Sequence, residues 1–129
     1  MFEFPSEFEW RTPWIPIDDP TLIEEFGPIF ADPDENAAPA PTLAEELHRE
    51  MPKGHLLYGL KVKAVAFCVA DHNEFLFVTN DPNKPIAWVH LTWSVESDRK
   101  WPFTCIYRTI AEWVDRMNRE HNVYANRSE

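Results

Sequence analysis

Glycine and cysteine are scarce in this chain of 129 residues. The three glycines, Gly27, Gly54 and Gly59, are too few for a glycine-rich loop, which excludes the usual cradle for nucleotide phosphates. Two cysteines cannot form a disulfide framework, so we expect Cys68 and Cys105 to be reduced, buried thiols. No apolar run approaches the roughly 18 residues that span a membrane, and the first residues lack a signal-peptide pattern. These absences predict a cytoplasmic protein.

The spacing patterns of known metal and catalytic centres are also missing. The five histidines show neither HxxxH nor HxH spacing and no CxxC pair exists, so the sequence predicts no metal site. Cys68, Cys105 and Ser94 are the candidate nucleophiles. Cys68 lies in an apolar run that disfavours a thiolate, Cys105 has no activating pattern, and Ser94 is not in a GxSxG turn. We therefore predict no catalytic residue, no cofactor and no enzymatic activity.

Negative charge is in excess and is unevenly distributed. The whole chain carries a net charge of −10. Residues 1–50 account for −11 and residues 51–129 for +1. Nucleic acid is a poor partner for such a surface, because phosphate binding needs clustered lysine and arginine. The acidity either serves solubility alone or attracts a protein with a basic surface.

The centre of the chain contains three apolar runs separated by two turn signals. The runs cover residues 60–69, 75–79 and 86–93. The turn-forming residues 71–73, Asp-His-Asn, separate the first run from the second, and Pro82 and Pro85 separate the second run from the third. Connections this short cannot contain a crossover helix, so we expect a three-stranded antiparallel meander. The runs are apolar on both faces, which requires cover on both sides of the sheet.

Two segments outside these runs have the start signal and the periodicity of helices. Thr42 and Thr109 each precede a glutamate by three residues, which is the capping-box pattern. Apolar residues recur at helical spacing after each threonine: Leu43, Leu47 and Met51 in one segment, Ile110, Trp113, Val114 and Met117 in the other. The first helix should stop at Pro52, with His48 and His55 on the surface. The second, from about 109 to 120, should cover one face of the sheet.

The first 41 residues are rich in proline, acidic side chains and aromatic rings. Within residues 1–19, prolines exclude a helix and aromatic rings alternate with glutamates: Phe2, Phe4, Phe8 and Trp10. We expect an extended arm whose rings cover the chain's own sheet, on the face opposite the last helix, or dock on another protein. A short helix capped by Asp19 should follow over residues 19–28, and a linker over residues 31–41.

His90, Thr92 and Trp93 form a polar constellation in the third apolar run. His90 and Thr92 should share a face with Ile86 and Trp88. Polar groups on an apolar face need hydrogen-bond partners. Either these side chains are buried with all their hydrogen bonds made and help to hold the sheet in place, or they line a small polar pocket in which His90 acts as an acid–base group.

Three short patterns carry a resemblance to known proteins. VHLTWS (residues 89–94), WPFT (101–104) and EWVDRM (112–117) resemble a set of small bacterial proteins without an established activity. The resemblance covers about residues 54–121 and implies a shared fold and a bacterial source. A short acidic chain without a catalytic motif is also similar in general character to immunity proteins, which neutralise a toxin by binding it.

These observations predict one α+β domain in three parts: an acidic arm and loop (1–41), an α-β-β-β-α core (42–121) and a frayed tail (122–129). We expect a cytosolic binding protein of the immunity or inhibitor type, which occludes a partner with a basic surface such as a toxin. The expected contact residues are Glu7, Glu9, Trp10, Asp18, Asp19, Asp32, Asp34 and Glu35. The alternatives are a small-ligand or enzymatic domain with a pocket at His90, Thr92 and Trp93, and a homodimeric interaction module built on the arm.

Overall fold

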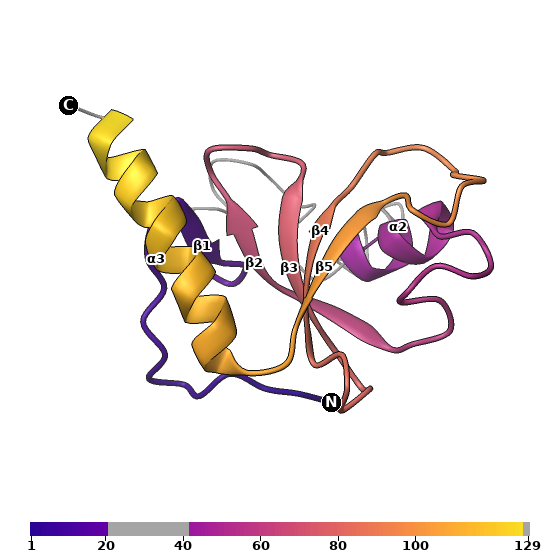
Figure 1. Ribbon diagram of the computed structural model, residues 1–129, viewed down its shortest axis with the longest axis horizontal. Coiled ribbons are helices and arrows are strands. Elements are labelled where there is room, and N and C mark those ends of the chain that lie inside the picture. The colour runs from indigo at the N-terminus through magenta and orange to yellow at the C-terminus, as the bar shows by residue number, and fades with distance from the viewer. Residues whose placement is uncertain (21–41, 128–129) are drawn as a thin grey trace.

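One antiparallel sheet with strand order β1-β2-β3-β4-β5 forms the centre of the computed structural model, which describes residues 1–20 and 42–127. Two helices lie on opposite sides of this sheet (Figure 1). The elements are β1 (Trp14–Pro16), α2 (Leu43–Glu50), β2 (Val62–Cys68), β3 (Glu74–Thr79), β4 (Ile86–His90), β5 (Phe103–Tyr107) and α3 (Ile110–Arg127). The predicted α+β class is confirmed, with more strands than the sequence indicated. The helix expected over residues 19–28 and the linker over 31–41 fall almost wholly outside the described residues.

The three predicted strands are the inner strands of the sheet. β2 pairs with β3 and β3 with β4, both antiparallel. The third run is shorter than predicted, because the strand ends at His90 and the backbone of Trp93 turns into the left-handed region at φ 59°. Every residue of β3 after the first is buried, as two-sided cover requires.

Two edge strands were not predicted. β1 comes from the arm and pairs Trp14 with Cys68, and β5 begins directly after Pro102 and pairs with β4. Prolines mark both segments, and proline argues against a strand inside a sheet. An edge strand tolerates proline, because one side of its backbone has no ladder to complete. Pro16 therefore lies within β1 without breaking the pairing.

Helix α2 covers one face of the sheet, as its periodicity predicted. The Thr42 hydroxyl accepts a hydrogen bond from the Glu45 N–H at 3.1 Å, which caps the helix. Leu43 and Leu47 are buried with Met51, which follows the helix. They belong to one cluster with the apolar side chains of the strands, among them Phe67, Phe75, Phe77 and Val89.

Helix α3 covers the other face. Thr109 accepts the Glu112 N–H at 3.1 Å, and Trp113 and Met117 are buried against the sheet. The predicted fraying after residue 121 is wrong, because the helix continues to Arg127. No glycine or proline interrupts residues 121–127, and the His121 ring donates a hydrogen bond to the Thr12 carbonyl at 2.7 Å.

The arm packs beside α3 and not on the opposite face, which corrects the sequence-based expectation. Its rings lie in the same cluster as Trp113. The ring centroids of Trp10 and Trp113 are 6.4 Å apart, and those of Trp14 and Trp113 are 5.0 Å apart. The Phe2 N–H also donates to the Thr79 carbonyl at 3.1 Å. The arm is therefore part of the chain's own core, beneath α3 in Figure 1.

His55 is buried, and its predicted surface position is wrong, whereas His48 is exposed. The His55 Nδ1 atom accepts the Leu57 N–H at 3.0 Å, so its Nε2–H donates to the Pro102 carbonyl at 2.8 Å. Burial lowers the pKa of His55, which keeps the ring neutral. The loop that carries it has no periodicity from which its burial could be read.

Neither helix of the described chain combines the length and the apolar character that a membrane crossing needs.

Candidate functional site

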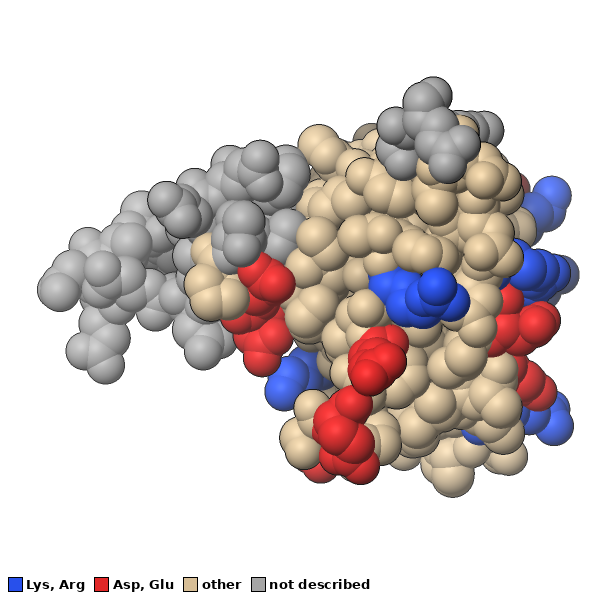
Figure 2. All heavy atoms as spheres, turned by 90° about the vertical axis from the view of Figure 1, so that its left-hand side faces the viewer, with Lys and Arg blue, Asp and Glu red and all other residues tan. Residues whose placement is uncertain are grey.

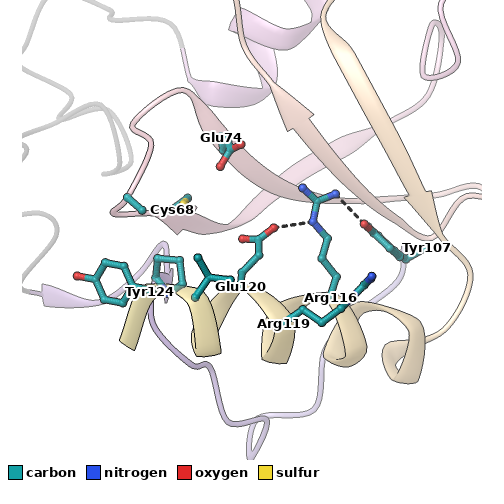
Figure 3. A pocket seen from close by; sticks show the side chains of 10 residues that line it. Cys68, Glu74, Tyr107, Arg116, Arg119, Glu120 and Tyr124 are labelled. Atoms are coloured by element: carbon teal, nitrogen blue, oxygen red, sulfur yellow. Dashed lines mark hydrogen bonds and ion pairs between the residues drawn. The ribbon is translucent and has the colours of Figure 1, made fainter. Parts of the chain in front are cut away.

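A cavity of about 520 Å³ opens between α3 and the ends of β2 and β3. Figure 3 shows Cys68 and Glu74 on the sheet side of this cavity and Arg116, Glu120 and Tyr124 on the helix side. Charged groups of both signs and two tyrosines meet here, where sequence analysis placed no site. The complete lining is Pro13, Cys68, Ala70, Glu74, Tyr107, Arg116, Arg119, Glu120, Val123 and Tyr124.

Arg116 is held on three sides by the fold itself. Its guanidinium carbon lies 4.2 Å from the centre of the Trp88 ring. Its Nη1–H donates to the Tyr107 hydroxyl and its Nε–H to Glu120, both at 2.7 Å. Burial opposes the charge, but these two hydrogen bonds keep the pKa of Arg116 above its ordinary value. Glu120 also accepts the Trp14 indole N–H at 2.6 Å, so this network ties α3 to β5 and β1.

Glu74 and Cys68 form the opposite wall. Glu74 is partly buried, and burial together with the nearby Asp71 charge raises the pKa of its carboxyl. Cys68 is fully buried, and burial raises the pKa of its thiol to about 12. The thiol therefore remains protonated and is a poor nucleophile, as its position in an apolar run predicted. Cys105 is partly buried and Ser94 is exposed.

Asp71, Glu74 and His90 come together at the edge of this cavity. One carboxylate oxygen from each acid and one imidazole nitrogen all lie within 4.8 Å of one another. The sequence singled out His90 but not the two acids. The register that pairs Glu74 with His90 across β3 and β4 creates the group, and no local spacing in the sequence announces it.

His90, Thr92 and Trp93 have different partners. His90 shares the α3 face with Trp88, whose ring centre lies 6.4 Å away, as its alternation predicted. Thr92 lies beyond the end of β4, and both its N–H and its hydroxyl donate to Glu50 Oε1, at 2.7 and 3.0 Å. The Trp93 N–H donates to Glu50 Oε2 at 2.9 Å. Glu50 belongs to α2, on the opposite side of the sheet from α3, so these residues are not brought together as one group.

Glu50 is completely buried, and sequence analysis did not identify it. Burial and a hydrogen bond with Glu46 raise its pKa to about 7, against the opposing hydrogen bonds from Thr92 and Trp93. Glu46 is itself paired with Arg49 at 2.7 Å. The Glu50 carboxyl thus holds the backbone that follows β4, and its charge changes near neutral pH.

The acidic residues expected to contact a partner lie on the outer side of the arm. Glu7, Glu9 and Asp18 are exposed, whereas Asp19 and Trp10 are partly buried. Trp10 packs against the arm's phenylalanine rings, with Phe8 nearest at 4.8 Å between ring centres. Figure 2 shows acidic side chains along the lower left of this end of the molecule, with basic side chains close to them, and charges of both signs at its right-hand edge. The remaining expected contact residues, Asp32, Asp34 and Glu35, lie outside the described part of the chain.

No protein-family model matches the chain, and neither the curated proteins nor the solved structures include a significant match to it.

Proposed function

We propose that the chain is a bacterial, cytoplasmic inhibitor-type protein that binds and occludes a protein with a basic surface, such as a toxin. The observation that carries this proposal is the division of the arm into an inner aromatic side and an outer acidic side. Its rings belong to the core cluster that contains Trp113. Glu3, Glu7 and Glu9, which alternate with those rings, are exposed.

The acidic side is held in place before any partner arrives. The Phe2 N–H donates to the carbonyl of Thr79, the last residue of the central strand β3, and the Phe8 N–H donates to the Pro5 carbonyl at 3.0 Å within the arm. Rings of the arm contact one another with centres 4.8–5.4 Å apart. A pre-ordered surface loses little conformational entropy on binding, so its charges are available for association.

Four exposed acids of the arm form no ion pair with another described residue: Glu3, Glu7, Glu9 and Asp18. The ion pairs of the described residues instead join Arg49 to Glu46, Arg116 to Glu120 and Arg119 to Asp115. Arg11, the one basic residue among residues 1–20, instead donates to the Asn118 side chain at 2.7 Å. The arm therefore presents net negative charge, which steers a basic partner toward it and weakens in salt.

A charge-neutralised variant tests this proposal better than a truncation, because a truncated chain would lose β1 and the buried Trp14. The test variant replaces four exposed acids of the arm: Glu3→Gln, Glu7→Gln, Glu9→Gln and Asp18→Asn. A control variant carries Glu45→Gln, Glu112→Gln and Asp115→Asn, which are exposed acids on the two helices. Glutamine at 112 keeps an acceptor for the Arg108 N–H.

Each form is used as bait in a lysate of the source cells at low and high salt, and captured proteins are identified by mass spectrometry. We expect a basic protein that the wild type and the control variant retain, and that the arm variant loses. High salt should release it from the wild type. Retention by the arm variant, or the absence of any specific basic protein, would overturn the proposal.

A further inference from the structure

Two strand ends and one turn bring two carboxylates and an imidazole to one point on the α3 side of the sheet. Glu74 begins β3 and His90 ends β4, and they are direct cross-strand partners, so their side chains share a face. Asp71 lies in the preceding turn, and its carbonyl accepts the Glu74 N–H at 3.1 Å. The three ligand atoms lie within 4.8 Å of one another on a backbone that the sheet fixes.

Neighbouring groups hold the Asp71 carboxylate and the backbone next to His90. Asp71 Oδ1 accepts the Asn73 backbone N–H at 3.0 Å, which orients the carboxylate within the turn. The Asn73 carbonyl in turn accepts the Leu91 N–H at 2.8 Å and ties the turn to the residue after His90. Such outer contacts are the kind that hold ligands in metal centres.

The group has an excess of negative charge. Asp71 and Glu74 are like charges in a partly buried setting, and Glu120 adds a third carboxylate whose field reaches Glu74. Two arginines line the same cavity: Arg116, which already donates to Glu120 and Tyr107, and Arg119, which is paired with Asp115 at 3.6 Å. A bound cation would therefore remove a repulsion that the surrounding side chains leave in place.

We propose that Asp71, Glu74 and His90 bind a divalent transition-metal ion of the zinc or manganese type. The imidazole argues against calcium and magnesium, whose protein ligands are oxygen atoms. Tetrahedral ligands at about 2.1 Å from one ion lie about 3.4 Å apart. Ligand atoms that are up to 4.8 Å apart must therefore close by up to about 1.4 Å, which rotation of the flexible Asp71 and Glu74 side chains can supply. Histidine with carboxylates is a donor set that both zinc and manganese accept.

The proposed site borders the cavity at Glu74. Glu74 is at once a ligand and a wall of the space of about 520 Å³ between α3 and the sheet. Three protein ligands with open positions beside a cavity are the arrangement that lets a metal hold water or a small ligand. This inference stands apart from the acidic arm, and either can fail without the other.

The test is calorimetric titration of the full chain with Zn²⁺ and, separately, with Mn²⁺. We expect one ion per chain, and at least a tenfold loss of affinity for both ions in His90→Gln and in Glu74→Gln. His48→Gln, an exposed histidine on α2, is the matched control and should bind as the wild type does. Circular dichroism confirms that each variant is folded. Equal affinity in the wild type and both site variants would overturn the proposal.

A second measurement needs no substitution. Mn²⁺ is paramagnetic and, unlike zinc, has little preference for thiolates, so it also separates this site from the neighbouring Cys68. At substoichiometric Mn²⁺, the imidazole signals of His90 should broaden before those of His48 and His121 in a proton NMR spectrum. Uniform broadening of all histidines, or broadening that spares His90, would contradict the assignment.

Discussion

Raising the pH from 5 to 8 should destabilise the fold by about 2–3 kcal/mol through Glu50. This carboxyl is buried, and its pKa is raised from 4.5 to about 7 by burial and by Glu46. Between these two values the folded chain keeps a proton that the unfolded chain releases. The free energy of unfolding therefore has its full Glu50 contribution below pH 4.5 and loses it as the pH rises through 7.

Urea unfolding followed by tryptophan fluorescence at pH 5, 6, 7 and 8 measures this decline. The matched variant is Glu50→Gln, which keeps the shape of the side chain but has one acceptor oxygen in place of two. It leaves one backbone N–H of Thr92 or Trp93 without its acceptor, so at pH 5 it should be less stable than the wild type by about 1–3 kcal/mol.

The difference between wild type and Glu50→Gln isolates the hydrogen-bonded pair of Glu50 and Glu46, because the titrations of groups away from this pair are common to both. The stability of the wild type relative to the variant should be greatest at pH 5 and should fall steadily toward pH 8. Parallel stability curves across this range would refute the argument that the buried charge of Glu50 is unfavourable.

Three further predictions concern the core. Trp113→Ala should lower the free energy of unfolding by about 3–5 kcal/mol, because the ring is fully buried between α3, the arm and the sheet; a loss under about 1 kcal/mol in urea titration would contradict that packing. Arg116→Lys should lose the paired contacts to Trp88 and Tyr107 and about 1–2 kcal/mol of stability by the same assay, whereas an unchanged midpoint would mean that one point charge suffices. The pKa of His55 should lie below 6.5 when it is followed by NMR, because the ring is buried in its neutral form. Its contribution to the free energy of unfolding should be complete above pH 6.5 and should be lost as the pH falls. A pKa at or above 6.5 would contradict this burial.

The inner strands and both described helices were readable from local sequence. β2, β3 and β4 are apolar runs between turn residues, and the threonines that cap α2 and α3 are visible as capping boxes. Such signals act over a few residues, so no long-range contact is needed to recognise them. The edge strands β1 and β5 were missed because their prolines oppose a strand locally, while pairing with a neighbour decides the outcome.

The candidate site was mostly hidden for the same reason. His90 was recognisable as a polar residue on an apolar face, but Glu74 reaches it only through the β3–β4 register. Glu50 contacts Thr92 across 42 positions of sequence, and α2 gives no local sign that its last residue is buried with a hydrogen-bonded carboxylate. The acidity of the arm was evident from composition, whereas the inward direction of its rings depended on α3.

The most direct test of the proposed function is the association rate constant between this chain and its captured basic partner, measured by stopped-flow fluorescence at two ionic strengths. For the wild type, the rate constant should fall at least tenfold between low and high salt, because exposed carboxylates of the arm steer the encounter. The variant that lacks Glu3, Glu7, Glu9 and Asp18 should associate slowly at both. Equal rate constants and equal salt dependence in the two forms would contradict the account.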